Sequence, residues 1–319
     1  MFFPFSHEQL SEACTPTSAR TYLFAYSNDW VRVEFEYVLQ ALFRVGESDK
    51  YAWLANVRYD LRQPEDVGFY SNWGSWNSSV YARFPNTSLG FEDSQTGSDI
   101  LTVLDKFLNH PLASCGPMIH VLLKRSPNEK DIKNLVAKVR QNNGVVRVII
   151  PTNSSGGLYP ETMYDLATKT NGLGMIALNY ERSYIALQDI CFIDYDPYQV
   201  YAVNVNVSGV GSMSLPDLSL PFGTYYNYLV TLQDNGVLST FQSMNLTASN
   251  PYQTIRVSSV RDGGLMSDPG TNYRWEQHYT DGGNYAMKFD FNYTDSRVQT
   301  LQIRVTSISR TNYWIPYAD

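Results

Sequence analysis

Short apolar runs and stretches of helical spacing alternate through the first half of the chain. Apolar residues recur three or four positions apart beside Phe35, from Ile100 to Leu108 and from Ile132 to Val139, which predicts amphipathic helices. Runs typical of buried strands cover residues 21–25, 52–59, 80–84, 118–123, 145–150 and 175–178. Strands that alternate with helices predict a mostly parallel, doubly wound sheet with helices on both of its faces.

Beyond residue 200 the spacing of hydrophobic residues changes to a period of two. Alternation is strongest at 203–207, 289–293 and 301–305, and turn signals fall at 234–236, 262–264 and 281–283. This pattern predicts an antiparallel β-sandwich. We therefore expect an α/β domain over residues 15–192 and an all-β domain over 196–319. The two Asp-Gly-Gly triplets fit hairpin turns better than calcium loops, which need a longer series of ligands.

Composition excludes several classes of protein. The 319 residues are 43% hydrophobic and 17% charged, which is typical of a globular chain of two domains. A net charge of −7 argues against nucleic acid as a partner, and no apolar run approaches the roughly 20 residues of a membrane span. The chain carries no phosphate-binding loop, nucleophile elbow or zinc-protease helix. We predict a protein that is not an enzyme and needs no cofactor, with His120 structural inside its strand.

Six Asn-x-Ser/Thr sequons indicate the secretory route. Their asparagines are Asn77, Asn86, Asn153, Asn206, Asn245 and Asn292. The last three alternate with apolar neighbours, so we expect them to be exposed on the outward faces of strands and glycosylated. The alternative, that they are ordinary surface asparagines, stays open. No signal peptide is evident at the start of the chain, and we favour a secreted protein whose leader is missing here over a cytosolic one.

Three cysteines and two tryptophans are further candidates. Cys14 and Cys191 flank the first predicted strand and the last predicted helix, so we predict a disulfide between them. Cys115 is then unpaired or linked to another chain. Trp73 and Trp76 lie in a stretch rich in Gly, Ser and Asn. Exposed, they suit stacking on a sugar or contact with a protein; burial over the sheet edge is the alternative, and we favour it slightly.

Residues 155–172, which begin Ser-Gly-Gly-Leu-Tyr-Pro, carry the most specific family match, and residues 22–29 and 298–304 support it. These segments resemble von Willebrand A-type domains and, more narrowly, a set of nematode secreted proteins of uncharacterised function. In that set such domains occur alone or beside C-type lectin domains. The resemblance implies extracellular recognition of a protein or glycan ligand, in gut or innate defence secretions.

The same resemblance implies a metal site that this chain has lost. Metal-binding relatives place Asp-x-Ser-x-Ser after the first strand and another carboxylate after the fourth; the matching positions here are Ala25, Ser27, Asp29 and Arg125. A guanidinium cannot ligate a cation, and about 5 Å from a divalent ion it costs roughly 6–7 kcal/mol at an effective dielectric of about 20. We predict that Arg125 pairs with Asp29 in place of the ion and meets an acidic ligand directly.

The function that we expect is recognition or adhesion by a secreted, non-enzymatic glycoprotein with a degenerate metal-ion-dependent adhesion site. Two alternatives remain. A carbohydrate-acting hydrolase with its site between the domains would show two close carboxylates in a cleft. A structural extracellular component would have no specific ligand.

Overall fold

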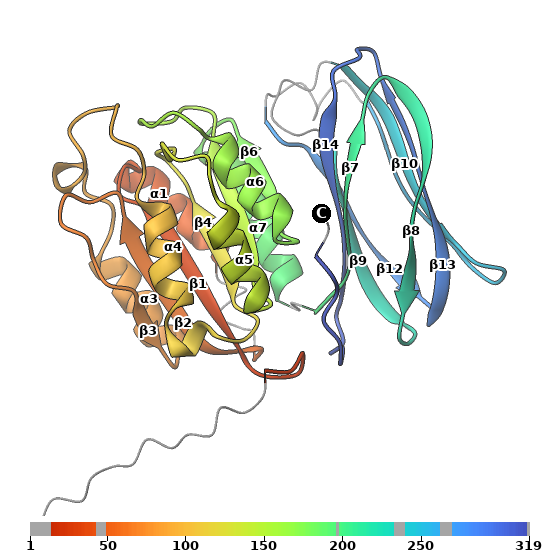
Figure 1. Ribbon diagram of the computed structural model, residues 1–319, viewed down its shortest axis with the longest axis horizontal. Helices are drawn as coiled ribbons and strands as arrows, with labels where there is room; N and C mark the ends of the chain where they lie inside the picture. The colour runs from red at the N-terminus through yellow and green to blue at the C-terminus, as the bar shows by residue number, and fades with distance from the viewer. Residues whose placement is uncertain (1–13, 43–48, 196–197, 233–239, 262–269, 318–319) are drawn as a thin grey trace, which may run out of the picture.

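The structure, a computed structural model, describes residues 14–42, 49–195, 198–232, 240–261 and 270–317. An α/β domain is followed by a β-sandwich (Figure 1). Among these residues the α/β sheet has six strands in the order β3-β2-β1-β4-β5-β6, and only the β2–β3 pair is antiparallel. Its strands are β1 (Arg20–Ser27), β2 (Tyr51–Tyr59), β3 (Gly68–Tyr70), β4 (Met118–Leu122), β5 (Val145–Pro151) and β6 (Gly174–Ala177).

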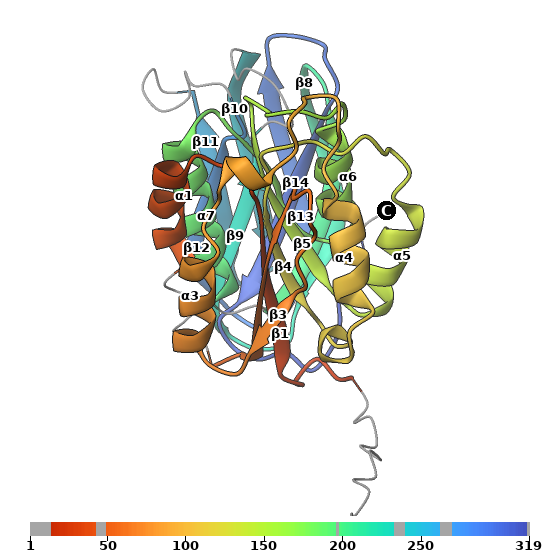
Figure 2. The ribbon, with the colours of Figure 1, turned by 90° about the vertical axis from the view of Figure 1, so that its left-hand side faces the viewer.

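Helices cover both faces of this sheet (Figure 2). One face carries α1 (Arg32–Leu39), α3 (Trp73–Ala82) and α7 (Tyr180–Asp194). The other carries α4 (Ile100–Leu108), α5 (Lys133–Gln141) and α6 (Glu161–Lys169). Short 3₁₀ turns are η1 (Gln40–Leu42), η2 (Thr87–Leu89) and η3 (Pro111–Ala113). Within the described ranges no helix is long and apolar enough to cross a membrane.

Strand β1 shows why the sheet needs two layers of helices. Tyr22, Phe24 and Tyr26 pack into the core on the α1 side, whereas Leu23 and Ala25 belong to the core on the α4 side. All five side chains are buried, so the strand is apolar throughout rather than alternating. The predicted doubly wound α/β fold is confirmed.

One predicted strand, residues 80–84, is wrong, because its first part belongs to helix α3. Asn72 caps this helix: its side chain accepts a hydrogen bond from the backbone N of Ser75 at 2.9 Å. Trp76 and Val80, four residues apart, fill the buried face of the helix. A five-residue stretch that is apolar except for Arg83 fits both periods, and here the cap and the i, i+4 pair decide for helix.

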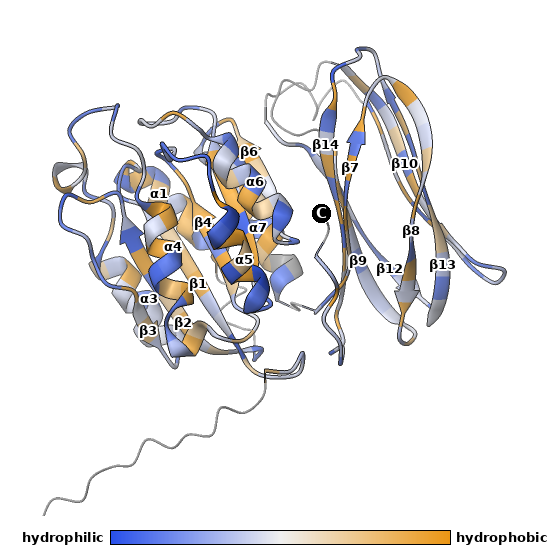
Figure 3. Ribbon diagram, viewed as in Figure 1, coloured by the Kyte–Doolittle hydropathy of each residue, from blue (hydrophilic) through white to orange (hydrophobic). Residues whose placement is uncertain are grey.

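The second half of the chain folds as two antiparallel sheets. Within the described residues each has four strands, in the orders β12-β9-β14-β7 and β11-β10-β13-β8. The strands are β7 (Tyr198–Val207), β8 (Val210–Leu220), β9 (Thr224–Thr231), β10 (Phe241–Ser249), β11 (Thr254–Val260), β12 (Tyr273–Thr280), β13 (Gly283–Tyr293) and β14 (Gln299–Ser307). Leu301, Ile303 and Val305 enter the core between the sheets, as their alternation predicts. The predicted β-sandwich is confirmed, and Figure 3 shows its hydrophobic positions interleaved with polar ones along the strands.

Of the three predicted hairpin turns, only one lies in the described part of the chain. Residues 234–236 and 262–264 lie outside the described residues. The turn at 281–283 joins β12 to β13, which belong to opposite sheets. It therefore carries the chain across the sandwich and does not close a hairpin within one sheet.

The outward face of β14 is covered by the α/β domain. Gln302 accepts a hydrogen bond from the backbone N of Gly174 at 3.1 Å and donates to Thr168 Oγ1 at 2.6 Å. Arg304 donates from Nε to the carbonyl oxygen of Gly172 at 2.9 Å. Both side chains are fully buried. The polar face of this strand is therefore the interface between the two domains.

The C-terminal segment lies between the domains and adds to this interface (Figure 1). The ring of Trp314 lies 4.9 Å from the guanidinium carbon of Arg20 at the start of β1. The hydroxyl of Tyr317 donates to the carbonyl oxygen of Gly144, just before β5, at 2.8 Å. The last residues of the chain thus tie the sandwich to the amino ends of the α/β strands.

Candidate functional site

An ion pair occupies the carboxyl edge of the α/β sheet. Arg125, after β4, donates from Nε to Asp29 Oδ2, after β1, at 2.8 Å. A second guanidinium nitrogen, Nη1, donates to the carbonyl oxygens of Asp93 at 2.8 Å and Thr96 at 2.7 Å. Ser155 Oγ also donates to Asp29 Oδ2, at 2.6 Å. The predicted Arg125–Asp29 pair is present, with side-chain exposures of only 3% and 9%.

This burial corrects one expectation. Because Arg125 is almost completely covered, its charge is used inside the protein, and an acidic ligand does not meet it directly. Lys124 beside it is also buried; its Nζ donates to Asn153 Oδ1 at 3.1 Å and lies 5.1 Å from the centre of the Trp30 ring. The two basic residues after β4 hold loops together.

The glycine pair of the 155–172 segment explains how this loop closes over Arg125. Gly157 has a φ of 76°, and a side chain there would collide with the carbonyl group of Ser126. A side chain on Gly156 would collide with the Arg125 guanidinium. The backbone N of Ser126 donates to the carbonyl oxygen of Gly156 at 2.8 Å. Two residues without side chains therefore let the loop lie directly on the ion pair.

A buried carboxyl group that sequence reasoning missed lies beside this pair. Asp60 follows β2 with a φ of 63° and accepts hydrogen bonds from Ser27 Oγ at 2.5 Å and Ser98 Oγ at 2.6 Å. Burial raises the pKa of Asp60 to about 8, although both serine hydroxyls oppose the shift. At neutral pH this carboxyl is mostly protonated. The only sequence signal was an aspartate directly after an apolar strand.

These residues do not fit a divalent cation. Ala25 is buried in the sheet and offers no ligand atom, and the hydroxyl of Ser27 is turned to Asp60. Asp29 is held by Arg125 and Ser155. Hard cations need several oxygen ligands, with ionised carboxylates among them. Over the described ranges, no group of three or more His, Cys, Asp or Glu side chains has a metal-binding arrangement.

The two tryptophans form part of the core and its rim. Trp76 is buried, donates from Nε1 to the carbonyl oxygen of Ala55 at 2.9 Å and packs against Tyr22. Trp73 is half-buried and stacks on Trp76, with ring centroids 4.6 Å apart. The idea of two exposed tryptophans on a loop is wrong, because the segment is a capped helix. The alternative of burial describes Trp76 correctly.

The predicted disulfide is also wrong. Cys14 pairs with Cys115, with the two Cα atoms 5.4 Å apart. The physical reason is that β1 and β4 are parallel neighbours, so the segments that precede them lie at the same edge of the sheet. Cys191 is instead a buried thiol on the inner face of α7. The prediction brought the two ends of the α/β domain together and did not use the adjacency of β1 and β4.

Cys191 lies against a fully buried polar cluster. Its Sγ is 3.8 Å from His120 Nδ1, and His120 Nε2 lies 2.7 Å from Asp194 Oδ2. Arg147 donates to the other carboxylate oxygen of Asp194 at 2.5 Å. Burial raises the pKa of the Cys191 thiol and lowers the pKa of His120. The cluster places a thiol next to an imidazole and the imidazole next to a carboxylate, as in a catalytic triad. An enclosed and protonated thiol is, however, not a nucleophile. His120 is hydrogen-bonded within the core.

All six sequon asparagines lie outside the hydrophobic cores. Asn86, Asn153 and Asn206 are exposed, and Asn77, Asn245 and Asn292 are partly exposed. The strand register expected for Asn206, Asn245 and Asn292 is confirmed, since their alternate neighbours are the buried ones. Whether these residues carry glycans stays a prediction.

One family model and several solved structures are similar to parts of this chain. Residues 203–308 match a family described as a domain of unknown function, DUF7154. A von Willebrand factor type A structure from Catenulispora acidiphila is 9% identical, covers 92% of this chain and 59% of its own length, and has a TM-score of 0.40. This chain therefore spans less than two thirds of that protein.

Two further solved structures cover smaller shares of this chain. The SpRpn10 VWA domain is 11% identical over 53% of this chain and 94% of its own, with a TM-score of 0.36. A family 35 carbohydrate binding module from Clostridium thermocellum is 12% identical over 34% of this chain and 95% of its own, with a TM-score of 0.23. No curated protein matches the sequence. The fold class rests on the strand orders and the helical layers described above.

Proposed function

We propose that the protein is a secreted, non-enzymatic recognition protein whose α/β domain, of the von Willebrand A type, engages its ligand without a metal ion. The observation that carries this proposal is the buried pair of Arg125 and Asp29 at the carboxyl edge of the sheet. The ligand is an extracellular protein or glycan. The resemblance to nematode secreted proteins supports a role in gut or innate defence secretions.

Electrostatics supports binding without a metal. A divalent ion beside Asp29 would lie near a guanidinium that already donates to one carboxylate oxygen and two carbonyl oxygens. The ion would be repelled by that charge by roughly 6–7 kcal/mol at about 5 Å. This repulsion exceeds the binding free energy that one carboxylate and a serine hydroxyl can contribute. Asp60, protonated at neutral pH, adds no negative charge.

Secretion is supported by two features of the surface. The Cys14–Cys115 disulfide needs an oxidising compartment to form and persist. The six sequon asparagines are exposed or partly exposed, as glycosylation requires. Both features are those of an extracellular glycoprotein.

The absence of enzymatic activity is part of the proposal. Three buried groups with perturbed pKa values that could carry chemistry, Asp60, His120 and Cys191, are each engaged inside the protein. The hydrolase alternative needs two close carboxylates in a cleft between the domains. Among the described residues at the interface, Gln302 and Arg304 hydrogen-bond to the α/β domain. Asp189 of α7 is a carboxylate there, and it accepts a hydrogen bond from the Tyr273 hydroxyl of β12. These contacts support two domains acting as one unit.

A binding screen tests the proposed function. The full-length protein, secreted from eukaryotic cells, is applied to glycan and extracellular-protein arrays in buffer with magnesium, manganese and calcium, and again in buffer with EDTA. We expect the same ligand to be bound with equal affinity in both buffers. Binding that EDTA abolishes, or hydrolysis of an arrayed glycan, would contradict the proposal.

A further inference from the structure

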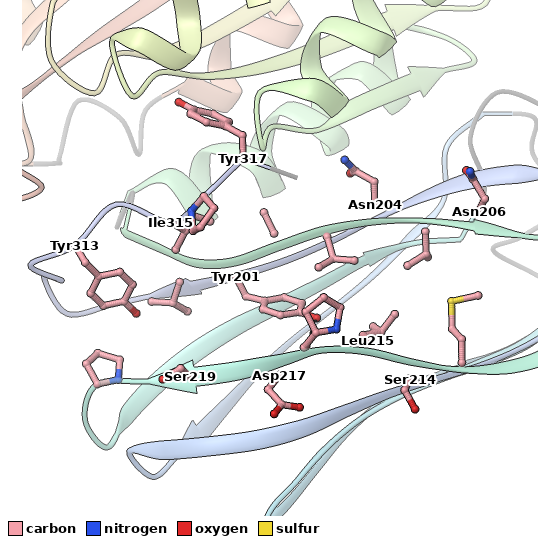
Figure 4. Close-up of a pocket in the computed structure, with 18 residues that line it drawn as sticks. Tyr201, Asn204, Asn206, Ser214, Leu215, Asp217, Ser219, Tyr313, Ile315 and Tyr317 are labelled. Carbon is pink, nitrogen blue, oxygen red and sulfur yellow. Dashed lines mark hydrogen bonds between the residues drawn. The ribbon is translucent and has the colours of Figure 1, made fainter. Parts of the chain in front are cut away.

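A groove of about 930 Å³ runs along the open side of the sandwich, between the edge strands β7 and β8. Apolar side chains from both strands form its interior: Tyr201, Val203, Val205, Met213 and Leu215. Figure 4 shows Tyr201 and Leu215 in the space between the two strands, and Asn204 and Asn206 directed toward the α/β domain. The groove therefore follows the rim of the sandwich core beside β7, where Val203 and Met213 are partly exposed.

The free edge of β7 presents unpaired backbone groups to this groove. The backbone N of Gln302 donates to Thr231 Oγ1, on the β9 side of β14, at 2.8 Å. Gln302 and its partner Asn204 on β7 therefore do not exchange backbone hydrogen bonds. By the alternation of an antiparallel ladder, the N–H and C=O groups of Ala202, Asn204 and Asn206 all point to the open edge. No other segment among the described residues pairs with them.

The C-terminal residues Tyr313, Ile315, Pro316 and Tyr317 line one end of the groove, but the residues of β7 themselves lack the features that protect edge strands. From Tyr201 to Val207 it has no proline and no charged residue, and its one register shift lies before this stretch. Strand β8 across the groove is protected: it contains Pro216 at a register shift, and the carbonyl oxygen of Pro216 accepts from the Tyr201 hydroxyl at 2.8 Å. A long, regular, apolar edge is one to which another strand adds.

We propose that the edge of β7 binds an extended segment of a partner protein, which adds as a fifth strand to the sheet β12-β9-β14-β7. The outward N–H and C=O groups belong to every second residue of β7 and therefore recur about every 6.6–6.8 Å. An extended polypeptide presents matching groups at this spacing, whereas a lipid or a sugar does not. Alternate side chains of the segment enter the groove and are apolar. No lysine or arginine lines the groove, and Asp217 stands on its rim, so flanking basic residues are favoured over acidic ones.

A second copy of this chain is the competing occupant. Pairing of β7 with another β7 would bring no basic residue to the rim, because residues 201–207 contain none. The partner segment is therefore a different sequence. This inference is independent of the metal-free edge of the α/β domain, so either proposal can fail without the other.

The probe is a set of fluorescent ten-residue peptides in which valine alternates with threonine, with either lysine or glutamate at both ends. Binding to the full-length glycosylated protein is measured by anisotropy, and amide hydrogen exchange locates the site. We expect saturable binding, two- to fivefold tighter for the lysine peptide, with new protection at Ala202, Asn204 and Asn206. Ala202→Pro deletes one outward N–H without breaking the β14 ladder and should weaken binding at least about tenfold. The control Ala202→Thr keeps that N–H and should stay within about twofold.

Several results would overturn the inference. The inference is wrong if Ala202→Pro and Ala202→Thr bind the peptides equally well. It is also wrong if hydrogen-exchange protection is located elsewhere, or if binding appears only in the Asn206→Gln variant. Self-association of the protein that Ala202→Pro abolishes would assign the edge to a second copy. If Ala202→Pro does not fold, the exchange map of the unaltered protein with the two peptides decides.

Discussion

Replacing Arg304 by methionine removes the charged side chain at the centre of the domain interface. Its guanidinium is fully buried and is surrounded by five acceptors, four backbone carbonyls and one side-chain amide, at 2.8 to 3.0 Å. The acceptors are Asn171 O, Gly172 O, Val203 O, Ile303 O and Asn204 Oδ1. Two of them belong to the loop before β6 and three to the sandwich. The side chain therefore joins the two domains.

The size of the effect follows from what the substitution leaves behind. Methionine donates no hydrogen bond, so buried carbonyl groups on both domains lose their donor, at about 1–3 kcal/mol for each group left unsatisfied. Burial disfavours the charged form and lowers the pKa of Arg304 from 12.5 to about 9, which offsets part of this loss. We expect Arg304→Met to lower the free energy of unfolding by about 2–3 kcal/mol.

Guanidinium chloride unfolding, followed by tryptophan fluorescence and by far-ultraviolet circular dichroism, measures this loss. We expect a lower midpoint and separation of the two signals, because the domains become less coupled. The control is Arg256→Met on the exposed side of β11, which should change stability by less than about 0.5 kcal/mol. An Arg304→Met loss equal to that of the control, with one coincident transition, would refute this account of the interface.

Three further predictions concern the carboxyl edge, the disulfide and the glycans. Because burial raises the pKa of Asp60 from 3.8 to about 8, its contribution to the free energy of unfolding is complete below pH 3.8 and is lost as pH rises through about 8. In urea unfolding experiments across this pH range, the free energy of unfolding should fall less for Asp60→Asn than for the unaltered protein, and an equal fall would contradict the assignment. Cys14→Ser opens a loop of 101 residues and should cost about 4–5 kcal/mol, while a peptide map should show the Cys14–Cys115 link and not Cys14–Cys191. Mass spectrometry of secreted protein should find glycans on Asn206, Asn245 and Asn292, and unmodified peptides at all three would oppose the secretory assignment.

The sequence predicted the layers of this protein better than its contacts. Hydrophobic periodicity gave the parallel sheet and the sandwich, because both depend on local alternation and burial. It also gave the inward positions Leu301, Ile303 and Val305. It did not reveal the roles of Gln302 and Arg304, since periodicity separates the two faces of a strand but does not show that a second domain covers the polar one.

The candidate site was predicted in part for the same reason. The Arg125–Asp29 pair followed from the family resemblance, which assigns both residues to the positions of one metal site. The pairing of Cys14 with Cys115 and the burial of Asp60 depend on which strands are neighbours and on side chains from distant loops. The open edge of β7 is invisible to any local pattern, because an edge is defined by the strand that is missing beside it.

Calorimetric titration of the full-length protein with magnesium, manganese and calcium chloride tests the central claim most directly. We predict no heat of binding for any of the three ions and the same melting temperature with and without chelator, because Arg125 and Ser155 hold Asp29 and two serine hydroxyls hold Asp60. An affinity of millimolar or tighter that disappears in Asp29→Ala would contradict the account.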